Sequence, residues 1–169
     1  MIETKKEHFM RLYEPVHERF ERFCKARSYG EVDFKDLMHD TLIVAFEKLD
    51  QLKVEGTFLH FLFGICIRIL ANQRKKKRPE YYDDSDKYKH LTSSETNIEQ
   101  QLEIENLYKQ LGQLEATTRE CIILFEISGF SIREIMEIQN LGESAVKQRL
   151  SRGRKQLVEL MKELDKISA

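Results

Sequence analysis

Hydrophobic positions recur at helical spacing in two parts of the chain, residues 5–76 and 101–165. In both parts apolar residues return every three or four positions, which places them on one face of an α-helix. Residues 77–100, between them, carry no sustained apolar period and contain Pro79 and a cluster of Ser, Thr and Asn, a composition typical of an exposed linker. The pattern therefore predicts an all-α protein with two small helical domains joined by a flexible linker.

Several helix starts are marked by side chains that can bind free backbone N–H groups. Asp33 precedes the amphipathic run DLMHDTLIVAFEKL. Two pairs have the spacing of a capping box, Thr117 with Glu120 and Ser131 with Glu134. In a capping box each side chain accepts a hydrogen bond from the other residue's backbone. We therefore expect helices to begin just after Asp33, Thr117 and Ser131.

The composition agrees with a helical protein of the cytosol. Only 7 Gly and 2 Pro occur in 169 residues, too few for a many-turned β architecture. Cys24, Cys66 and Cys121 lie far apart within apolar runs, so we expect buried, reduced thiols. The polar start MIETKKEHFMRLYEP does not resemble a signal peptide. The longest apolar run, FLHFLFGICIRILA, is interrupted by His60 and Arg68 and is too short to cross a bilayer. We therefore expect a cytoplasmic chain with no membrane insertion.

Charge is divided unevenly along the chain. The 28 basic and 29 acidic residues give a net charge of −1. Yet residues 68–78 hold six basic side chains and no acid, whereas residues 80–106 hold eight acids against Lys87 and Lys89. Local patches rather than the average determine what binds a surface, so the near-zero net charge does not exclude a nucleic-acid partner.

The helix predicted for GESAVKQRLSRGRKQL has an apolar stripe of Val146, Leu150, Gly153 and Leu157. Gly153 on this stripe would permit a close approach to another helix. The opposite face carries hydroxyl, amide and cationic groups, which suit phosphates and base edges in the major groove. The preceding segment SIREIMEIQNLG predicts a short helix and a tight turn at residues 140–142, so the two segments form a helix-turn-helix pattern. The alternative is an ordinary amphipathic helix with a solvated basic face.

At these residues the chain resembles a known family. The stretch RECIILFEISGFSIREIMEIQNLGESAVKQRLSRGRKQL resembles region 4 of bacterial sigma factors. The stretches EVDFKDLMHDTLIVAFEKL and FLHFLFGICIRILANQRKKKR resemble region 2 of the same family. Two motif sets in this order, over about residues 10–160, are more specific than one helix-turn-helix. The plan resembles the extracytoplasmic-function sigma factors of the sigma-70 family.

The predicted helix over residues 36–49 has an acidic stripe that contains one apolar residue, Ile43. An apolar anchor with a charged rim is typical of a protein interface. The resemblance supplies core RNA polymerase as the partner, at its largest-subunit clamp and its flap. The expected polymerase-binding residues are Asp36, His39, Asp40, Ile43 and Glu47. A metal cluster of Asp36, His39 and Asp40 and a plain solvated acidic face are the alternatives.

The resemblance also assigns two promoter-binding surfaces. The loop DQLKVEGT and the helix over residues 57–75 are expected to engage the melted minus-ten element. Most of the nearby rings of Phe58, Phe61 and Phe63 are expected in the core at this helical spacing. The expected minus-ten residues are His60, Phe61, Arg68, Asn72 and Lys75. The expected minus-thirty-five residues are Ser144, Lys147, Gln148, Arg149, Ser151, Arg152 and Lys155.

Four positions depart from the family pattern. Phe61 replaces the usual Trp, Arg68 the usual Asn, and Glu115 the usual Pro, and Asn72 lies near the usual Asp. Phe61 keeps an aromatic ring, and Arg68 adds a cation to a face expected to approach DNA. These departures concern promoter preference more than the class of function.

The sequence thus favours a promoter-recognition subunit of RNA polymerase that binds promoter DNA and is not itself an enzyme. No cofactor is expected. An anti-sigma factor is a candidate further partner, because the family commonly uses one. The main alternative is a free-standing dimeric helix-turn-helix regulator that reads spaced half-sites. A helical hydrolase is disfavoured, because the sequence has no nucleophile–base pair, Gly-rich phosphate loop or HExxH motif.

Overall fold

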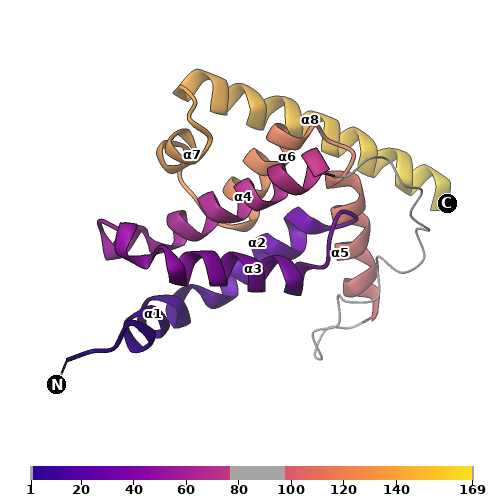
Figure 1. Cartoon of the computed structure of the whole chain (residues 1–169). Coiled ribbons are helices and arrows are strands. Elements are labelled where there is room, and N and C mark those ends of the chain that lie inside the picture. Colours follow the sequence, from indigo (N-terminus) through magenta and orange to yellow (C-terminus); the bar gives the residue numbers. More distant parts are fainter. Residues whose placement is uncertain (1, 77–97, 169) are drawn as a thin grey trace.

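The computed structural model describes residues 2–76 and 98–168, with side chains described outside residues 74–76. Within these ranges every regular element is a helix, as expected (Figure 1). We refer to residues 2–76 as the N-terminal block and to residues 98–168 as the C-terminal block. The linker expected at 77–100 lies largely outside the described residues, and a helix already begins at Ile98.

Four α-helices form the N-terminal block. Short 3₁₀ turns join α1 to α2 and shape the connection from α3 to α4. Asp33 caps α3 as expected, because its carboxylate accepts from the backbone N–H of Lys35 at 2.8 Å and of Asp36 at 3.3 Å. The helices are α1 (Lys5–Tyr13), α2 (His17–Ser28), α3 (Phe34–Glu47) and α4 (Phe58–Lys76).

The C-terminal block has four α-helices and one π turn. The capping box at the start of α7 is confirmed: the Ser131 hydroxyl accepts from the Glu134 N–H, and the Glu134 carboxylate accepts from the Ser131 N–H. The elements are α5 (Ile98–Leu111), α6 (Ala116–Ile122), the π turn (Ile123–Ile127), α7 (Ile132–Gln139) and α8 (Glu143–Ser168).

The capping box expected at Thr117 and Glu120 is wrong. Helix α6 already begins at Ala116, with Glu115 at its N-cap. The Thr117 hydroxyl donates to the Glu115 carboxylate at 2.6 Å, and this bond holds the Glu115 pKa below its usual value. Glu120 is 8% exposed and turns inward to an arginine of α2. The Glu120 carboxylate therefore binds a buried arginine and does not accept from a backbone N–H at the start of α6.

Both blocks share one connected hydrophobic core. In the N-terminal block α2 and α4 bring together Phe20, Phe23 and Phe63, each of which is fully buried. Phe23 and Phe63 pack edge to face with ring centroids 4.2 Å apart. All three cysteines are buried and carry free thiols, as expected. None of the described helices is long and apolar enough to cross a membrane.

The two blocks pack directly against each other (Figure 1). Phe130 of the C-terminal block is 3% exposed, and its ring lies 4.9 Å from those of His60 and Phe63 in α4. Arg19 of α2 stacks its guanidinium over the same ring at 5.2 Å and donates to the carbonyl of Ser128 at 2.7 Å. The ring of Phe130 therefore packs among side chains of the N-terminal block.

Candidate functional site

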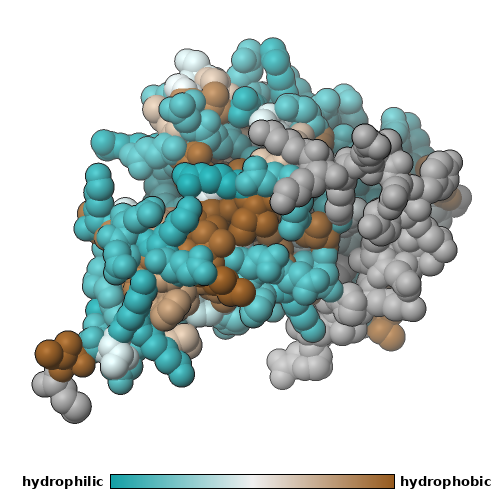
Figure 2. Space-filling model, in the orientation of Figure 1, coloured by the Kyte–Doolittle hydropathy of each residue, from teal (hydrophilic) through white to brown (hydrophobic). Residues whose placement is uncertain are grey.

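The acidic stripe of α3 lies on the surface. Asp36, His39, Asp40, Ile43 and Glu47 are all exposed, and Ile43 is 46% exposed. Within the N-terminal block Asp33, which caps α3, fixes where this face begins. In the view of Figure 2, apolar surface gathers over the α3 and α4 ribbons of Figure 1, with polar surface around it.

The structure adds Phe46 to the exposed face of α3. Its side chain is 37% exposed, and it lies three residues after Ile43, the spacing that places both on one helix face. The three-residue spacing from Ile43 to Phe46 is the sequence signal for this second apolar residue. Among the described residues, no group of three His, Cys, Asp or Glu side chains could hold a metal ion.

The expected minus-ten residues do not form one open strip along α4. Arg68 and Asn72 are exposed and Phe61 is partly buried. The side chain of Lys75 lies outside the described ones. His60 points to the C-terminal block, where its ring packs against Phe130 at 4.9 Å. The end of α4 that carries His60 is therefore covered by α7 and the segment before it.

His60 also lies near a carboxylate of α7. Its Nε2 is 3.4 Å from Glu134 Oε1, but neither ring nitrogen makes a hydrogen bond. The Glu134 pKa is lowered mainly by the backbone N–H of Ser131, with smaller contributions from His60 and Arg19. His60 and Glu134 thus lie close together across the contact between the blocks.

The helix-turn-helix geometry is present in α7 and α8. Asn140 ends α7 in the left-handed conformation, at φ 52° and ψ 55°. Asn tolerates this region better than most residues. Val146, Leu150 and Gly153 are buried as expected. A Cβ on Gly153 would lie 2.8 Å from Thr118 Cγ2 and 2.9 Å from Ile122 Cγ1, so α6 and α8 approach closely because of this glycine.

The opposite face of α8 is open to solvent. Its exposed residues are Ser144, Lys147, Gln148, Ser151, Arg152 and Lys155, all of them expected. Lys147 pairs with Glu143 one turn earlier and lowers the Glu143 pKa. The exposed hydroxyl and amide groups of this face can bind base edges, and the cations beside them can bind phosphates.

Arg149 differs from the other expected residues of α8 because it is only partly exposed. Its Nη1 donates to Gln139 Oε1 at 3.4 Å, and the Gln139 amide donates to the carbonyl of Thr117 at 3.1 Å. This chain of hydrogen bonds links α8 to α7 and α6. Arg149 thus lies at the side of the exposed face, where it also holds the two helices of the motif together.

Sequence reasoning missed the ionic cluster between the blocks. Arg27 of α2 is 1% exposed, and its Nη2 lies 2.7 Å from Glu120 Oε1. Arg27 also donates to Glu31 at 3.2 Å, and Glu31 accepts from Arg119 at 2.7 Å. The signal was the position of Arg27, which follows Phe20 on the apolar face of its helix, where a cation needs a buried partner.

The sequence is similar to those of known sigma factors. Residues 104–157 match the family model described as sigma-70, region 4. RNA polymerase sigma factor CnrH of Cupriavidus metallidurans is 30% identical over 149 residues, covering 80% of this chain and 78% of that protein. RNA polymerase sigma factor NccH of Alcaligenes xylosoxydans is 27% identical over 145 residues, with the same coverage.

Solved structures show the same fold. Sigma factor RpoE from Bartonella quintana, solved with the anti-sigma factor NepR, superposes with a TM-score of 0.74 at 25% identity, over 92% of this chain and 98% of that one. CnrH, solved with the cytosolic domain of CnrY, gives a TM-score of 0.70 at 23% identity, over 94% of this chain and 90% of that one. The fold and these relatives define a sigma-type transcription initiation factor. The chain belongs to the extracytoplasmic-function sigma factors of the sigma-70 family.

Proposed function

We propose that three exposed surfaces of this sigma factor divide the work of promoter recognition. The α3 face around Ile43 binds core RNA polymerase. Helix α4 and the loop before it engage the melted minus-ten element, chiefly through Arg68 and Asn72. The outer face of α8 reads the minus-thirty-five element. We further propose that residues 5–76 and 101–165 act as separate domains when bound to polymerase.

The observation that carries the proposal is the two-sided character of α8. Val146 and Leu150 are 0% and 3% exposed, whereas Gln148, between them in sequence, is exposed. The amide of Gln148 can pair with both N6 and N7 of adenine, which is a contact that specifies a base. Lys147 and Arg152 flank it and suit phosphates, which set position rather than sequence.

The near-neutral charge fits a subunit that acts within a larger assembly. Affinity for non-specific DNA grows with each phosphate that the protein neutralises. A chain with a net charge of −1 therefore gains little non-specific DNA affinity. We infer that polymerase supplies much of the affinity and all of the catalysis, and that the sigma factor itself is not an enzyme. We place its action in the cytoplasm, where RNA polymerase works.

An anti-sigma factor is a further partner in this proposal. Two proteins of the same fold were solved with partners, RpoE with the anti-sigma factor NepR and CnrH with the cytosolic domain of CnrY. The exposed apolar side chains of α3 provide a surface that a regulator could cover in competition with polymerase. Mutual exclusion of polymerase and regulator on α3 is the form of regulation that this surface supports.

The test is to mix the purified chain with core polymerase and measure transcription from a promoter library. The proposal predicts a 1:1 complex with polymerase and initiation at a subset of promoters. The alternative, a free-standing regulator, predicts a dimer that binds spaced half-sites without polymerase. A chain that dimerises, binds DNA alone and leaves core polymerase inactive would overturn the proposal.

A further inference from the structure

Helix α1 spans the base of the loop that joins α3 to α4. Phe9 of α1 is 6% exposed and packs edge to face on two rings, each with its centroid 5.5 Å away. One ring is Phe46, near the end of α3, and the other is Phe58, the first residue of α4. Residues 50–57 form the loop that connects the two helices carrying these rings. A single side chain of α1 therefore contacts both helices that flank the loop.

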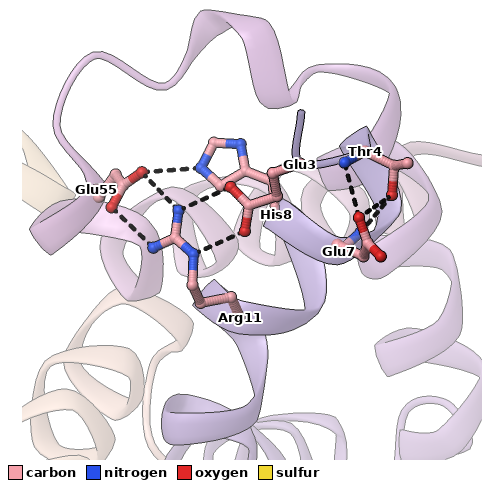
Figure 3. A network of polar contacts seen from close by, with 6 residues as sticks. All are labelled: Glu3, Thr4, Glu7, His8, Arg11 and Glu55. Carbon is pink, nitrogen blue, oxygen red and sulfur yellow. Dashed lines mark hydrogen bonds and ion pairs between the residues drawn. The ribbon is translucent and has the colours of Figure 1, made fainter. Parts of the chain in front are cut away.

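Polar contacts of α1 hold the second half of the loop (Figure 3). The Arg11 guanidinium lies between two carboxylates, donating to Glu3 at 2.9 and 3.2 Å and to both oxygens of Glu55 at 3.2 Å. His8 Nε2 lies 2.9 Å from the same Glu55 carboxylate. Arg11, followed by His8, lowers the Glu55 pKa. A guanidinium that binds two carboxylates at once is held in a narrower range of positions than one that makes a single exposed ion pair.

The first half of the loop is held by the same helix. Lys5 Nζ lies 3.3 Å from the Asp50 carboxylate and 3.4 Å from the carbonyl of Glu47. Asp50 and Glu55 are the two acidic side chains of the loop DQLKVEGT. Each of them is thus ion-paired with a cation of α1, which offsets charge that would repel a phosphate backbone.

Between these two anchors the loop projects into solvent. Gln51, Lys53 and Val54 are exposed, and Val54 is 58% exposed. The Thr57 hydroxyl donates to the carbonyl of Val54 at 2.7 Å and closes the second turn. The tip is therefore available to a partner while its two ends are fixed.

We propose that α1 is a brace that fixes loop 50–57 in position for the minus-ten strand and neutralises its two carboxylates. Arg11 is the main positioning residue, because it holds Glu55 without being part of the loop. The inference rests on the proposed function for its DNA partner. It goes beyond that function, because α1 carries none of the residues expected at the minus-ten element.

The experiment compares Arg11→Ala with Lys6→Ala in holoenzyme on two promoter libraries. Lys6 is exposed on the same helix and has no part in the network, so its variant controls for loss of one charge from α1. Arg11→Ala should reduce discrimination among minus-ten sequences by about two- to fivefold, the range of an exposed ion-pair network. Discrimination among minus-thirty-five sequences should stay unchanged. Glu55→Gln in the Arg11→Ala background should add little, because the two residues act together.

Amide hydrogen exchange of the free chain tests the brace without DNA. In Arg11→Ala the amides of Leu52 and Thr57, which donate to the carbonyls of Leu49 and Val54, should exchange several-fold faster than in Lys6→Ala. Equal exchange in the two variants, or an equal loss of discrimination at both promoter elements, would overturn the brace. If wild-type holoenzyme shows no promoter preference, the proposed function fails, and the exchange rates still decide whether α1 holds the loop.

Discussion

Arg27 and Glu120 are 93 residues apart in the sequence and meet in the interior, with Arg27 Nη2 2.7 Å from Glu120 Oε1. The Arg27 side chain is fully buried and that of Glu120 is 10% exposed. Glu31 and Arg119 extend the pair into a row of alternating charges across the contact between the blocks. Because the pair is buried, removing one partner leaves a charge without compensation.

Arg27→Ala should lower the free energy of unfolding by about 3–5 kcal/mol, the usual cost of breaking a buried pair. The measurement is urea unfolding followed by circular dichroism. Arg22→Ala, at an exposed position of the same helix, should change stability by less than about 0.5 kcal/mol. Replacing both Arg27 and Glu120 by Leu should cost less than Arg27→Ala alone. A loss below about 1 kcal/mol for Arg27→Ala would mean that the two blocks do not pack this way in the free chain.

Ile43→Arg should abolish binding to core polymerase and leave the fold intact. Ile43 is 46% exposed, so an arginine there stays solvated, whereas an unpaired buried arginine would cost several kcal/mol. The measurement pairs a thermal melt with a core-binding assay. Ile2→Arg is the matched control, because Ile2 is 97% exposed and lies outside the α3 face. Early melting of the Ile43 variant, or its normal binding to polymerase, would contradict the assignment of Ile43 to the polymerase-binding surface.

Two glycines in helices should respond to alanine with opposite signs. At Gly153 a Cβ would lie 2.8 Å from Thr118 Cγ2, so Gly153→Ala should destabilise the protein by about 1–3 kcal/mol through overpacking. At Gly64, within α4, no atom apart from the neighbouring residues and backbone of its own helix lies within 4 Å of the added Cβ. Gly64→Ala should therefore stabilise by about 0.5–1 kcal/mol through helix propensity. Unfolding midpoints of the two variants decide the matter, and a stabilised Gly153→Ala would contradict the close α6–α8 contact.

The local patterns predicted the fold well because each depends on neighbours in sequence. The cap at Asp33, the capping box at Ser131 and the buried stripe through Val146 and Gly153 were all confirmed. The capping box predicted at Thr117 was wrong, because the Glu120 carboxylate binds Arg27 of the other block. The three-residue spacing between Thr117 and Glu120 does not show which partner Glu120 binds.

The long-range contacts could not be predicted from one sequence. Nothing local indicates that His60, expected on a DNA-facing strip, packs on Phe130 of the other block. The contact of Arg11 with Glu55 spans 44 residues and depends on how α1 folds back over the loop. Both pairings are set by how the helices pack, which the periodicity of each helix does not specify.

The most direct test of the account concerns Gln148, at the centre of the exposed face of α8. Gln148→Ala should cost about 1–3 kcal/mol on the preferred minus-thirty-five element and relax preference at one base position. Arg152→Ala should instead weaken all promoters alike and reduce the salt dependence by about one phosphate contact. Lys147→Ala should cause a smaller loss of binding and of salt dependence than Arg152→Ala, because Glu143 already neutralises part of the Lys147 charge.

The measurement is holoenzyme binding across a promoter library at two salt concentrations, with Gln156→Ala as the control. Gln156 is an exposed glutamine about two turns further along α8. The account predicts that Gln148→Ala alone relaxes one position of the upstream element, while Gln156→Ala keeps the wild-type preference. If Gln148→Ala instead lowers binding to every promoter equally, α8 does not read bases through this face, and the central claim is contradicted.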